Sequence, residues 1–257
     1  MRKILIIPCH NCEIQITRLI SKMAQVKLVG YLDSVLFLVN PGNDQTEKAI
    51  AKIIHNLDVP AVILLNAENY GLGGSFKLAC EYSIKNSFES FIFFHGDDQA
   101  SVDDIIPMIQ EFELQGYSCL LGSRFMEGSS LSGYSKKREF ANRFLNVIFS
   151  IALKRTIYDI GSGLNIYRVN SLPIEKLKLW GNHIAFDINI LFHYTSRNND
   201  LRMGFYPISW SEEDQKSNAN NLFVTIKILK MLFLKLIGKD EVEKTINMRS
   251  ILVEPLE

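Results

Sequence analysis

Short apolar runs alternate with longer segments of helical spacing in the first 125 residues, and this alternation constrains the fold most. The apolar runs are Ile4–Ile7, Ser34–Val39, Ala61–Leu65, Phe91–Phe94 and Cys119–Leu121. The helical segments between them are Ile14–Met23, Thr46–Asn56, Ser75–Asn86 and Asp103–Gln115. Runs rich in β-branched and aromatic residues are typical of buried strands. Strands that alternate with helices imply right-handed crossovers, so we predict a mostly parallel sheet covered by helices on both faces.

The loops that follow these strands are predicted to share one edge of the sheet. In a parallel sheet the carboxyl ends of the strands lie together, and ligands bind beyond them. The loops read PCHNC, NPGND, NAENYGLGG, HGDDQ and GSRF. Their polar and glycine residues are therefore the first candidates for a binding site.

Beyond residue 125 the regular alternation stops. Glycine and serine crowd the stretch MEGSSLSGYSKKREF, and further helices are predicted at Glu139–Leu153, Phe186–Ser196 and Asn221–Ile237. The sequence contains no repeat and no linker that would split it. We interpret residues 1–218 as one α/β domain and residues 219–257 as a C-terminal helical appendage.

The composition narrows the compartment and the partners. The 257 residues include 28 basic and 28 acidic ones, so no global field attracts nucleic acid, and an anionic ligand needs a local cluster. The start, MRKILIIPCHN, meets a proline too early for a secretory h-region. Four cysteines without a framework of spacings suit a reducing compartment. We expect a cytoplasmic protein that binds no nucleic acid.

Cys9 and Cys12 have the spacing of a redox pair or of half a zinc site. A thioredoxin-like fold is usually much smaller than this chain, and the sequence lacks the second Cys-x-x-Cys or His pair that would complete a zinc site. The alternative is that both cysteines are small side chains beside a strand-to-helix loop.

The stretch FIFFHGDDQAS ends an apolar strand in two adjacent carboxylates, Asp97 and Asp98. Negative charge at this edge is costly unless a cation lies beside it, and a divalent cation that bridges to phosphate oxygens would offset the cost. The alternative is a helix cap, for which Ser101 or Asp103 is better placed.

The stretch NYGLGGSFKLAC places Gly71, Gly73 and Gly74 just before a predicted helix. Such glycines allow a ligand to approach the backbone amides at the start of a helix. The spacing is neither a Walker A motif nor a dinucleotide fingerprint. By itself this signal is weak.

Taken in order, these loops resemble the motifs of glycosyltransferase family 2, which are nucleotide-sugar transferases with the A-type glycosyltransferase fold. The resemblance is strongest to the dolichyl-phosphate mannosyltransferase-like branch and covers roughly residues 3–218. ILIIPCHNC resembles the IPxYNE start of the family, which implies that Pro8 and His10 help to form the nucleotide pocket. Cys12 stands in place of an acid, so the Cys-x-x-Cys spacing is interpreted as coincidental.

The next loops match the family's donor side. FLVNPGNDQT resembles VVDDGSxDGT, where Asp44 matches but Asn40 replaces an Asp that contacts the base or ribose. NAENYGLGGSFKLAC resembles xxNxGxGxAxxxG. In these two loops the resemblance implies donor-binding roles for Asn40, Asp44, Asn69, Gly71 and Gly74. It implies the same role for Gly96 in the loop HGDDQ.

FFHGDDQ resembles the family motif LDADLQ, whose second Asp binds the metal. Asp97 matches that Asp, Gln99 matches the supporting Gln, and His95 replaces the first Asp. Because a His can ligate a transition metal, both Mn²⁺ and Mg²⁺ are candidate cofactors.

The remaining motifs match the acceptor side. LGSRF carries Arg124 at the family's GSR, and KKREFANRFLN followed by YDIGSGLNIYR resembles RxxxSxxxN…xDxxSGFRxYR. The resemblance implies acceptor-side positions at Arg138, Asp159, Ser162, Gly163, Asp187, Lys216 and Ser217. Arg124 would help to stabilise the leaving group, and Asp187 or Asp159 would be the catalytic base for a hydroxyl acceptor; a lipid phosphate would need no base.

The resemblance implies a metal-dependent, inverting glycosyltransferase with a nucleotide-sugar half, residues 1–125, and an acceptor half, residues 126–218. The acceptor would be a lipid-linked (polyprenyl-phosphate-type) or saccharide molecule in cell-surface polysaccharide biosynthesis. Two alternatives stay open. A nucleotidyltransferase usually has a basic, glycine-rich first loop, which PCHNCEIQ lacks. A degenerate, non-catalytic nucleotide-sugar-binding module would explain the departures at Cys12, Asn40 and His95.

The segment NNLFVTIKILKMLFLKLIGK predicts a basic amphipathic helix. Lys227, Lys230 and Lys235 interrupt an apolar run that falls short of the ~20 residues of a membrane span. Such a helix can lie at the inner face of the cytoplasmic membrane, helped by Lys136, Lys137 and Arg138. The alternative is that its apolar face packs on the catalytic domain.

Overall fold

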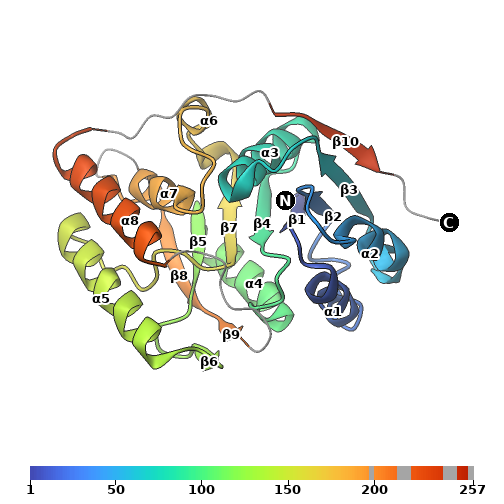
Figure 1. Cartoon of the computed structure of the whole chain (residues 1–257), viewed down its shortest axis with the longest axis horizontal. Coiled ribbons are helices and arrows are strands. Elements are labelled where there is room, and N and C mark those ends of the chain that lie inside the picture. The colour runs from blue at the N-terminus through green and yellow to red at the C-terminus, as the bar shows by residue number, and fades with distance from the viewer. Residues whose placement is uncertain (197–199, 213–220, 240–247, 254–257) are drawn as a thin grey trace.

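Eight strands form one central sheet with helices on both faces (Figure 1). The computed structural model describes residues 1–196, 200–212, 221–239 and 248–253. From one edge to the other the strands are β10 (Ser250–Val253), β3 (Ala61–Asn66), β2 (Ser34–Val39), β1 (Lys3–Cys9), β4 (Ser90–Phe94), β7 (Leu164–Arg168), β5 (Cys119–Ser123) and β8 (Met203–Pro207). A second sheet pairs β6 (Ser130–Ser132) with β9 (Ser209–Ser211).

Most strands of the large sheet are parallel, which confirms the predicted α/β class. β1 lies parallel to both β2 and β4, β2 to β3, and β5 to β8. Two exceptions were not predicted. β7 runs antiparallel between β4 and β5, and β10 runs antiparallel along β3. Both come from the irregular part of the chain, where the strand and helix periods give no clear signal.

The helices divide between the two faces of the sheet. The residues buried on one face include those of α1 (Glu13–Met23), α2 (Thr46–Ile53) and α4 (Ile105–Gln115). Those on the other face come from α3 (Gly71–Lys85), α5 (Lys136–Leu153), α6 (Ile174–Leu177), α7 (Phe186–Tyr194) and α8 (Asn221–Leu236). Short 3₁₀ turns cover Ile54–Asn56, Val102–Asp104 and Val169–Ser171. The core therefore lies on both sides of the sheet.

The predicted strands all exist, whereas two helices begin several residues earlier than predicted, α5 at Lys136 rather than Glu139 and α3 at Gly71 rather than Ser75. α3 begins at Gly71, so its glycines lie in the first turn of the helix rather than before it. A Cβ on Gly73 would lie 2.7 Å from the carbonyl oxygen of Gly181. The amide of Gly73 donates to the carbonyl of Asn182 at 3.0 Å. The glycines thus let α3 contact the backbone that leads into α7.

α8 packs against α5 and α7. Ile228, Met231 and Leu232 of this helix are at most 9% exposed. The sequence left open whether an apolar face of this segment packs on the domain, and for these three residues it does. Among the residues that the structure describes, none of the helices combines the length and apolar character needed to span a membrane.

Candidate active site

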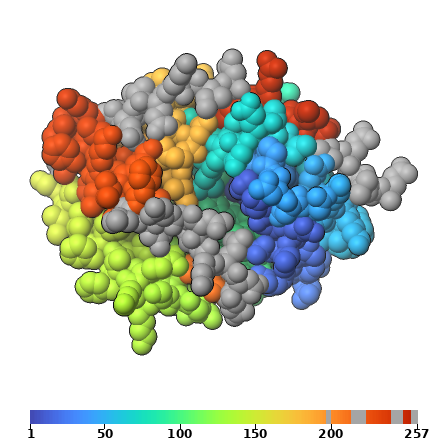
Figure 2. Space-filling model, in the orientation of Figure 1, coloured from blue at the N-terminus to red at the C-terminus, as the bar shows by residue number. Residues whose placement is uncertain are grey.

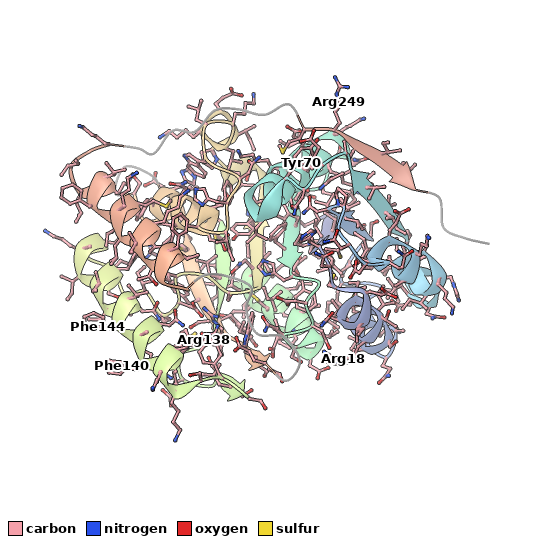
Figure 3. The ribbon with its side chains drawn as sticks, viewed as in Figure 1. Arg18, Tyr70, Arg138, Phe140, Phe144 and Arg249 are labelled. Atoms are coloured by element: carbon pink, nitrogen blue, oxygen red, sulfur yellow. The ribbon has the colours of Figure 1, made fainter. Side chains whose placement is uncertain are left out.

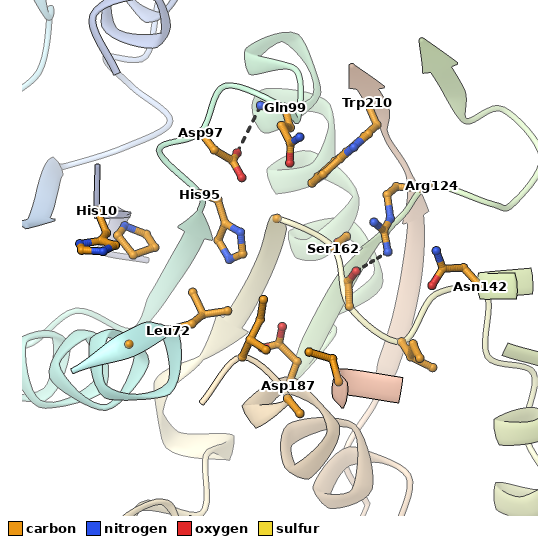
Figure 4. A pocket seen from close by; sticks show the side chains of 18 of the residues that line it. His10, Leu72, His95, Asp97, Gln99, Arg124, Asn142, Ser162, Asp187 and Trp210 are labelled. Carbon is orange, nitrogen blue, oxygen red and sulfur yellow. Dashed lines mark hydrogen bonds between the residues drawn. The ribbon is translucent and has the colours of Figure 1, made fainter. Parts of the chain in front are cut away.

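A pocket of about 540 Å³ opens at the carboxyl ends of the central strands and continues towards α5, α7 and α8. The loops predicted to share one edge of the sheet do meet there. The predicted site residues that line the pocket are Pro8, His10, Asn40, Asn69, Gly71, His95, Gly96, Asp97, Gln99, Arg124, Arg138, Ser162, Gly163 and Asp187. Figure 4 shows His95, Asp97, Arg124 and Asp187 around the same cavity.

Two predicted donor residues do not line this pocket. The carboxylate of Asp44 accepts hydrogen bonds from the Glu13 amide at 3.0 Å and from the Thr46 hydroxyl at 2.7 Å, so it ties its loop to the start of α1. Although burial acts to raise the pKa of Asp44, these hydrogen bonds lower it overall. A Cβ on Gly74 would lie 2.4 Å from the Tyr70 Cβ, so this glycine serves packing. Lys216 and Ser217 lie outside the described residues.

The end of the pocket near β1 and β2 is lined by amide and imidazole groups. Asn69 Nδ2 lies 3.1 Å from His10 Nε2, which joins the loops after β3 and β1. Asn40, only 5% exposed, accepts hydrogen bonds from Asn66 at 2.8 Å and from the Tyr70 amide at 3.2 Å. Its amide donates to the Ser75 hydroxyl at 3.1 Å. Asn40 therefore joins the end of β2 to α3 at the pocket wall.

The adjacent carboxylates after β4 have different surroundings. Asp98 has a left-handed backbone, with φ of 56°, and its side chain is 1% exposed. It forms ion pairs with Arg18 and with Lys22, the latter at 2.8 Å, both on α1. Asp97 lines the pocket, and within the described residues it forms no salt bridge. The structure therefore neutralises Asp98 and leaves the charge of Asp97 directed at the pocket.

The surroundings of Asp97 fit a divalent cation. Burial raises the pKa of Asp97 and lowers the pKa of His95, which keeps the imidazole in its neutral, metal-binding form. Gln99 lines the pocket beside them. No three His, Cys, Asp or Glu side chains of the described residues form a ready metal cluster. Mg²⁺ and Mn²⁺ sites of phosphate-handling enzymes often use one or two carboxylates and complete the shell with phosphate oxygens and water.

Asp187, in the first turn of α7, approaches the pocket from the opposite end (Figure 4). A Cβ on Gly161 would lie 3.7 Å from its Oδ2. No donor in the described part of the chain hydrogen-bonds to its carboxylate. Burial, and then the charge of Asp159, raise the pKa of Asp187 to about 7. A carboxylate with this pKa is suited to accept a proton near neutral pH.

Asp159, the other carboxylate considered as a base, is occupied by Arg124. The guanidinium of Arg124 contacts both carboxylate oxygens, at 2.8 and 2.9 Å, and the Arg124 amide donates to Oδ2 at 3.0 Å. Asp159 lies in a smaller neighbouring cavity and not in the main pocket. The sequence analysis named Asp187 or Asp159 as the base, and these contacts favour Asp187. They assign Asp159 to holding Arg124 in place.

Arg124 is correspondingly less free than a phosphate-binding arginine. Burial by itself lowers the pKa of the guanidinium, but its charge interaction and hydrogen bonds with Asp159 raise that pKa above its usual value. The guanidinium carbon lies 5.1 Å from the ring centre of Trp210. Arg124 therefore borders the pocket as half of a buried ion pair.

A model of the family described as "Glycosyl transferase family 2" matches residues 4–173 of the sequence. The chain belongs to glycosyl transferase family 2. It is therefore a glycosyltransferase that uses a nucleotide sugar. The alternative function of a nucleotidyltransferase is thereby excluded. No curated protein sequence matches the chain.

Solved structures with the same fold include two kinds of sugar transferase. Glucosyl-3-phosphoglycerate synthase from Mycobacterium tuberculosis, in complex with Mn²⁺, UDP and phosphoglyceric acid, matches with a TM-score of 0.64 and 13% identity, over 93% of this chain and 79% of that one. Mannosyl-3-phosphoglycerate synthase from Rubrobacter xylanophilus matches with a TM-score of 0.62 and 14% identity, over 93% and 75%. At these identities the likeness shows the fold alone.

Several residues that line the pocket of this family 2 transferase were missed by sequence reasoning. These residues are Trp210, Tyr134, Asn142 and Glu212. Glu212 forms an ion pair with Arg138, whose guanidinium carbon lies 4.7 Å from the Tyr134 ring centre. The available signal was the pair of aromatic residues in SGYSKK and PISWSE, Tyr134 and Trp210.

All four cysteines of the transferase are free and buried, including Cys9 and Cys12 in the pocket wall. Burial raises the pKa of Cys9 well above its usual value, whereas the hydrogen bond from Cys9 lowers the pKa of Cys12. The amide of Cys12 donates to the Thr46 hydroxyl at 2.9 Å. These contacts suit a loop whose shape matters more than its thiols.

We expect the double substitution Cys9→Ser with Cys12→Ser to leave the rate of sugar transfer within about threefold of the parent, because the loop contributes its shape and backbone contacts, and Cys9, a buried thiol with a raised pKa, is a poor nucleophile. The parent should also be insensitive to added reductant. Transfer assays with and without dithiothreitol measure both. Stoichiometric zinc in the parent that disappears in the double variant would contradict this interpretation.

Proposed function

We propose that the protein transfers a sugar, with inversion at the anomeric carbon, from a nucleoside diphosphate sugar to a hydroxyl group of a lipid-linked acceptor. The observation that carries the proposal is the position of two carboxylates in one pocket. Asp97 faces it from the end of β4, and Asp187 faces it from α7 (Figure 4). One suits a cation bound to the donor diphosphate, and the other suits a base beside the acceptor.

The donor would lie at the end formed by the loops after β1 to β4. Pro8, His10, Asn40, Asn69 and Gly71 border the space for the nucleoside. A divalent cation, Mn²⁺ or Mg²⁺, would be held by Asp97 with His95 and Gln99, and when bound it would offset the charge that develops on the diphosphate leaving group. Mycobacterium tuberculosis structures of the same fold contain UDP with Mn²⁺ or Mg²⁺, which supports this choice.

The acceptor side would use Asp187 as general base. Its ionised carboxylate takes the proton of the acceptor hydroxyl while that oxygen bonds to the anomeric carbon. The bond from the anomeric carbon to the diphosphate breaks in the same step, and the nucleoside diphosphate leaves with its electron pair. Direct displacement at one face of the sugar gives inversion.

The pocket wall beside Asp187 supports an acceptor with an apolar portion. Its apolar lining residues at that end are Ala141, Leu145, Ile160, Ile184, Ile188, Val224 and Ile228. Arg138 and Asn142 add polar groups that suit a phosphate or a sugar. We therefore favour a lipid-linked saccharide over a free saccharide, and a role in cell-surface glycan synthesis on the cytoplasmic side. The free cysteines are consistent with that reducing compartment.

A donor screen tests the proposal. The protein is titrated with UDP, GDP, dTDP and ADP with and without Mn²⁺, and the sugar nucleotides of those that bind are then assayed for hydrolysis and transfer. We expect tight binding of one nucleotide that depends on the cation, followed by turnover. Binding without hydrolysis or transfer to any acceptor would instead favour the non-catalytic module.

A further inference from the structure

Large apolar side chains are exposed along one side of α5. Phe140, Phe144, Val147 and Ile151 are between 54% and 74% exposed. Their spacing of four, three and four residues places them in a single stripe along the helix. The opposite side of α5 carries Leu145 and Phe149, which are buried. Figure 3 labels Phe140 and Phe144 at the outer edge of the molecule.

A second apolar stripe lies on α8. Phe223, Ile226, Phe233 and Leu236 are between 58% and 67% exposed, whereas Ile228, Met231 and Leu232 on its other side are buried. The helix is therefore apolar on the side that packs on the domain and also on the side that faces solvent. α5 and α8 pack against each other at one end of the molecule (Figures 1 and 2). All exposed phenylalanines of the described residues lie on these two helices.

We name the eight exposed side chains on these two stripes the α5–α8 face: Phe140, Phe144, Val147, Ile151, Phe223, Ile226, Phe233 and Leu236. Single exposed apolar residues are normal on soluble proteins, but a gathering of this size marks an interaction surface. The identity of the partner has to come from the charges around it.

Those charges are predominantly positive. α5 carries four basic residues and one acidic residue, and two of the four are in ion pairs, Arg138 with Glu212 and Arg143 with Glu139. Among the described residues no carboxylate pairs with Lys136 or Lys137 at the start of α5, and α8 carries three basic residues and no acidic one. The whole chain has zero net charge, so positive charge is concentrated on these helices. A second copy of the chain would bring two positive faces together, which opposes a symmetric dimer. An anionic membrane surface is attracted to the same charges, and its hydrocarbon accepts the aromatic side chains.

The position of the α5–α8 face relative to the pocket fits this partner. Ala141 and Leu145 of α5 and Val224 and Ile228 of α8 line the acceptor end of the pocket. The helices that would touch the membrane therefore also form the walls through which a lipid-borne acceptor has to pass. In this respect the inference rests on the proposed function.

We propose that the α5–α8 face is a docking surface for an anionic membrane, with the phenylalanines inserted at the headgroup boundary and Lys136 and Lys137 against the lipid phosphates. Each lysine near an anionic surface contributes about fivefold to the partition coefficient, equivalent to about 1 kcal/mol. A phenylalanine that leaves water for the interface contributes a similar or larger factor, up to about tenfold.

The test is vesicle co-sedimentation of the full chain, without donor. Vesicles of phosphatidylcholine with phosphatidylglycerol are compared with pure phosphatidylcholine, at low and high salt. We expect salt-sensitive binding to the anionic vesicles. Phe140→Ser with Phe144→Ser, and separately Phe223→Ser with Phe233→Ser, should each lower the partition coefficient at least about tenfold. Lys136→Gln with Lys137→Gln should lower it by about 25-fold at most.

The matched control is Ile14→Ser with Leu114→Ser, on α1 and α4. These side chains are 72% and 80% exposed but lie on helices that cover the other face of the sheet. We expect this control to bind like the parent. Absence of binding to anionic vesicles, or equal losses in the control, would overturn the inference. So would a dimer, detected by light scattering, that the phenylalanine variants dissociate, because the face would then be a self-interface.

Nucleotide titration of the same samples separates this inference from the proposed function. A protein that binds and turns over a nucleotide sugar but ignores vesicles contradicts only the docking surface. A protein that binds anionic vesicles but no nucleotide contradicts only the proposed function.

Discussion

Replacement of Asp97 by Asn should lower the rate of sugar transfer by about 10³-fold or more, because a cation at the leaving group contributes several kcal/mol to the transition state. Asp97 faces the pocket and forms no salt bridge with any of the described residues, so the amide removes the charge that would hold Mn²⁺ or Mg²⁺. The measurements are the transfer rate and, independently, the effect of Mn²⁺ on the affinity for the nucleoside diphosphate. Near-parental, chelator-sensitive transfer by the variant would show that the cation is held elsewhere.

The neighbouring carboxylate provides a matched control. Asp98→Asn removes the same charge one residue further on, but Asp98 is turned to Arg18 and Lys22 of α1. Asn also tolerates the left-handed backbone of this position. We expect Asp98→Asn to lower the free energy of unfolding by about 1–3 kcal/mol, less than for a fully buried pair because both cations keep access to water. Mn²⁺-dependent nucleotide binding should largely survive.

Replacement of Asp187 by Asn should lower kcat by about 10²- to 10⁴-fold, the usual contribution of a general base. The carboxylate accepts a proton only when it is ionised, and its pKa is raised to about 7. The parental kcat should therefore rise with pH through about 7 and then level, whereas the residual activity of the variant should lack this limb. A variant with parental kcat would indicate that the acceptor is already ionised, as a lipid phosphate is.

The same pKa shift affects the stability of the fold. The direction in which the Tm of Asp187→Asn changes therefore distinguishes a misfolded variant from one that has lost only its general base. Between the usual value of 3.8 and about 7, the folded protein binds more protons at Asp187 than the unfolded chain does. The free energy of unfolding therefore falls as the pH rises through this window. Asp187→Asn removes the free-energy cost of keeping an ionised carboxylate buried, so above pH 7 the variant should have a higher Tm than the parent. A lower Tm would mean that loss of activity reflects misfolding.

Much of the structure of residues 1–125 could be predicted from the sequence. Its five strands have apolar runs that are recognisable locally, and each is followed by a loop with polar or glycine residues. Because parallel strands place their carboxyl ends together, the order of motifs was enough to bring His10, Asn40, Asn69 and Asp97 to one pocket. The family followed from the same motifs, and the match over residues 4–173 confirms it. The dolichyl-phosphate mannosyltransferase-like branch stays a prediction.

The roles within the site were decided by contacts between residues far apart in the chain. The motif in the sequence assigned the metal to Asp97, but only the tertiary structure shows why its neighbour Asp98 is turned away from the pocket, towards Arg18 and Lys22 of α1. Asp159 and Asp187 were both candidates for the base in the sequence, and only the tertiary structure places Arg124 against Asp159.

α8 shows the same division between what the sequence predicts and what the tertiary structure decides. Its pattern of apolar residues and lysines in the sequence predicted an amphipathic helix, but could not show that one apolar side would be buried against α5 and α7 while another stayed exposed. Local periodicity determines secondary structure, because it depends on neighbours three or four residues away. The charge state and accessibility of a side chain depend on which distant elements pack against it, and only the tertiary structure decides that.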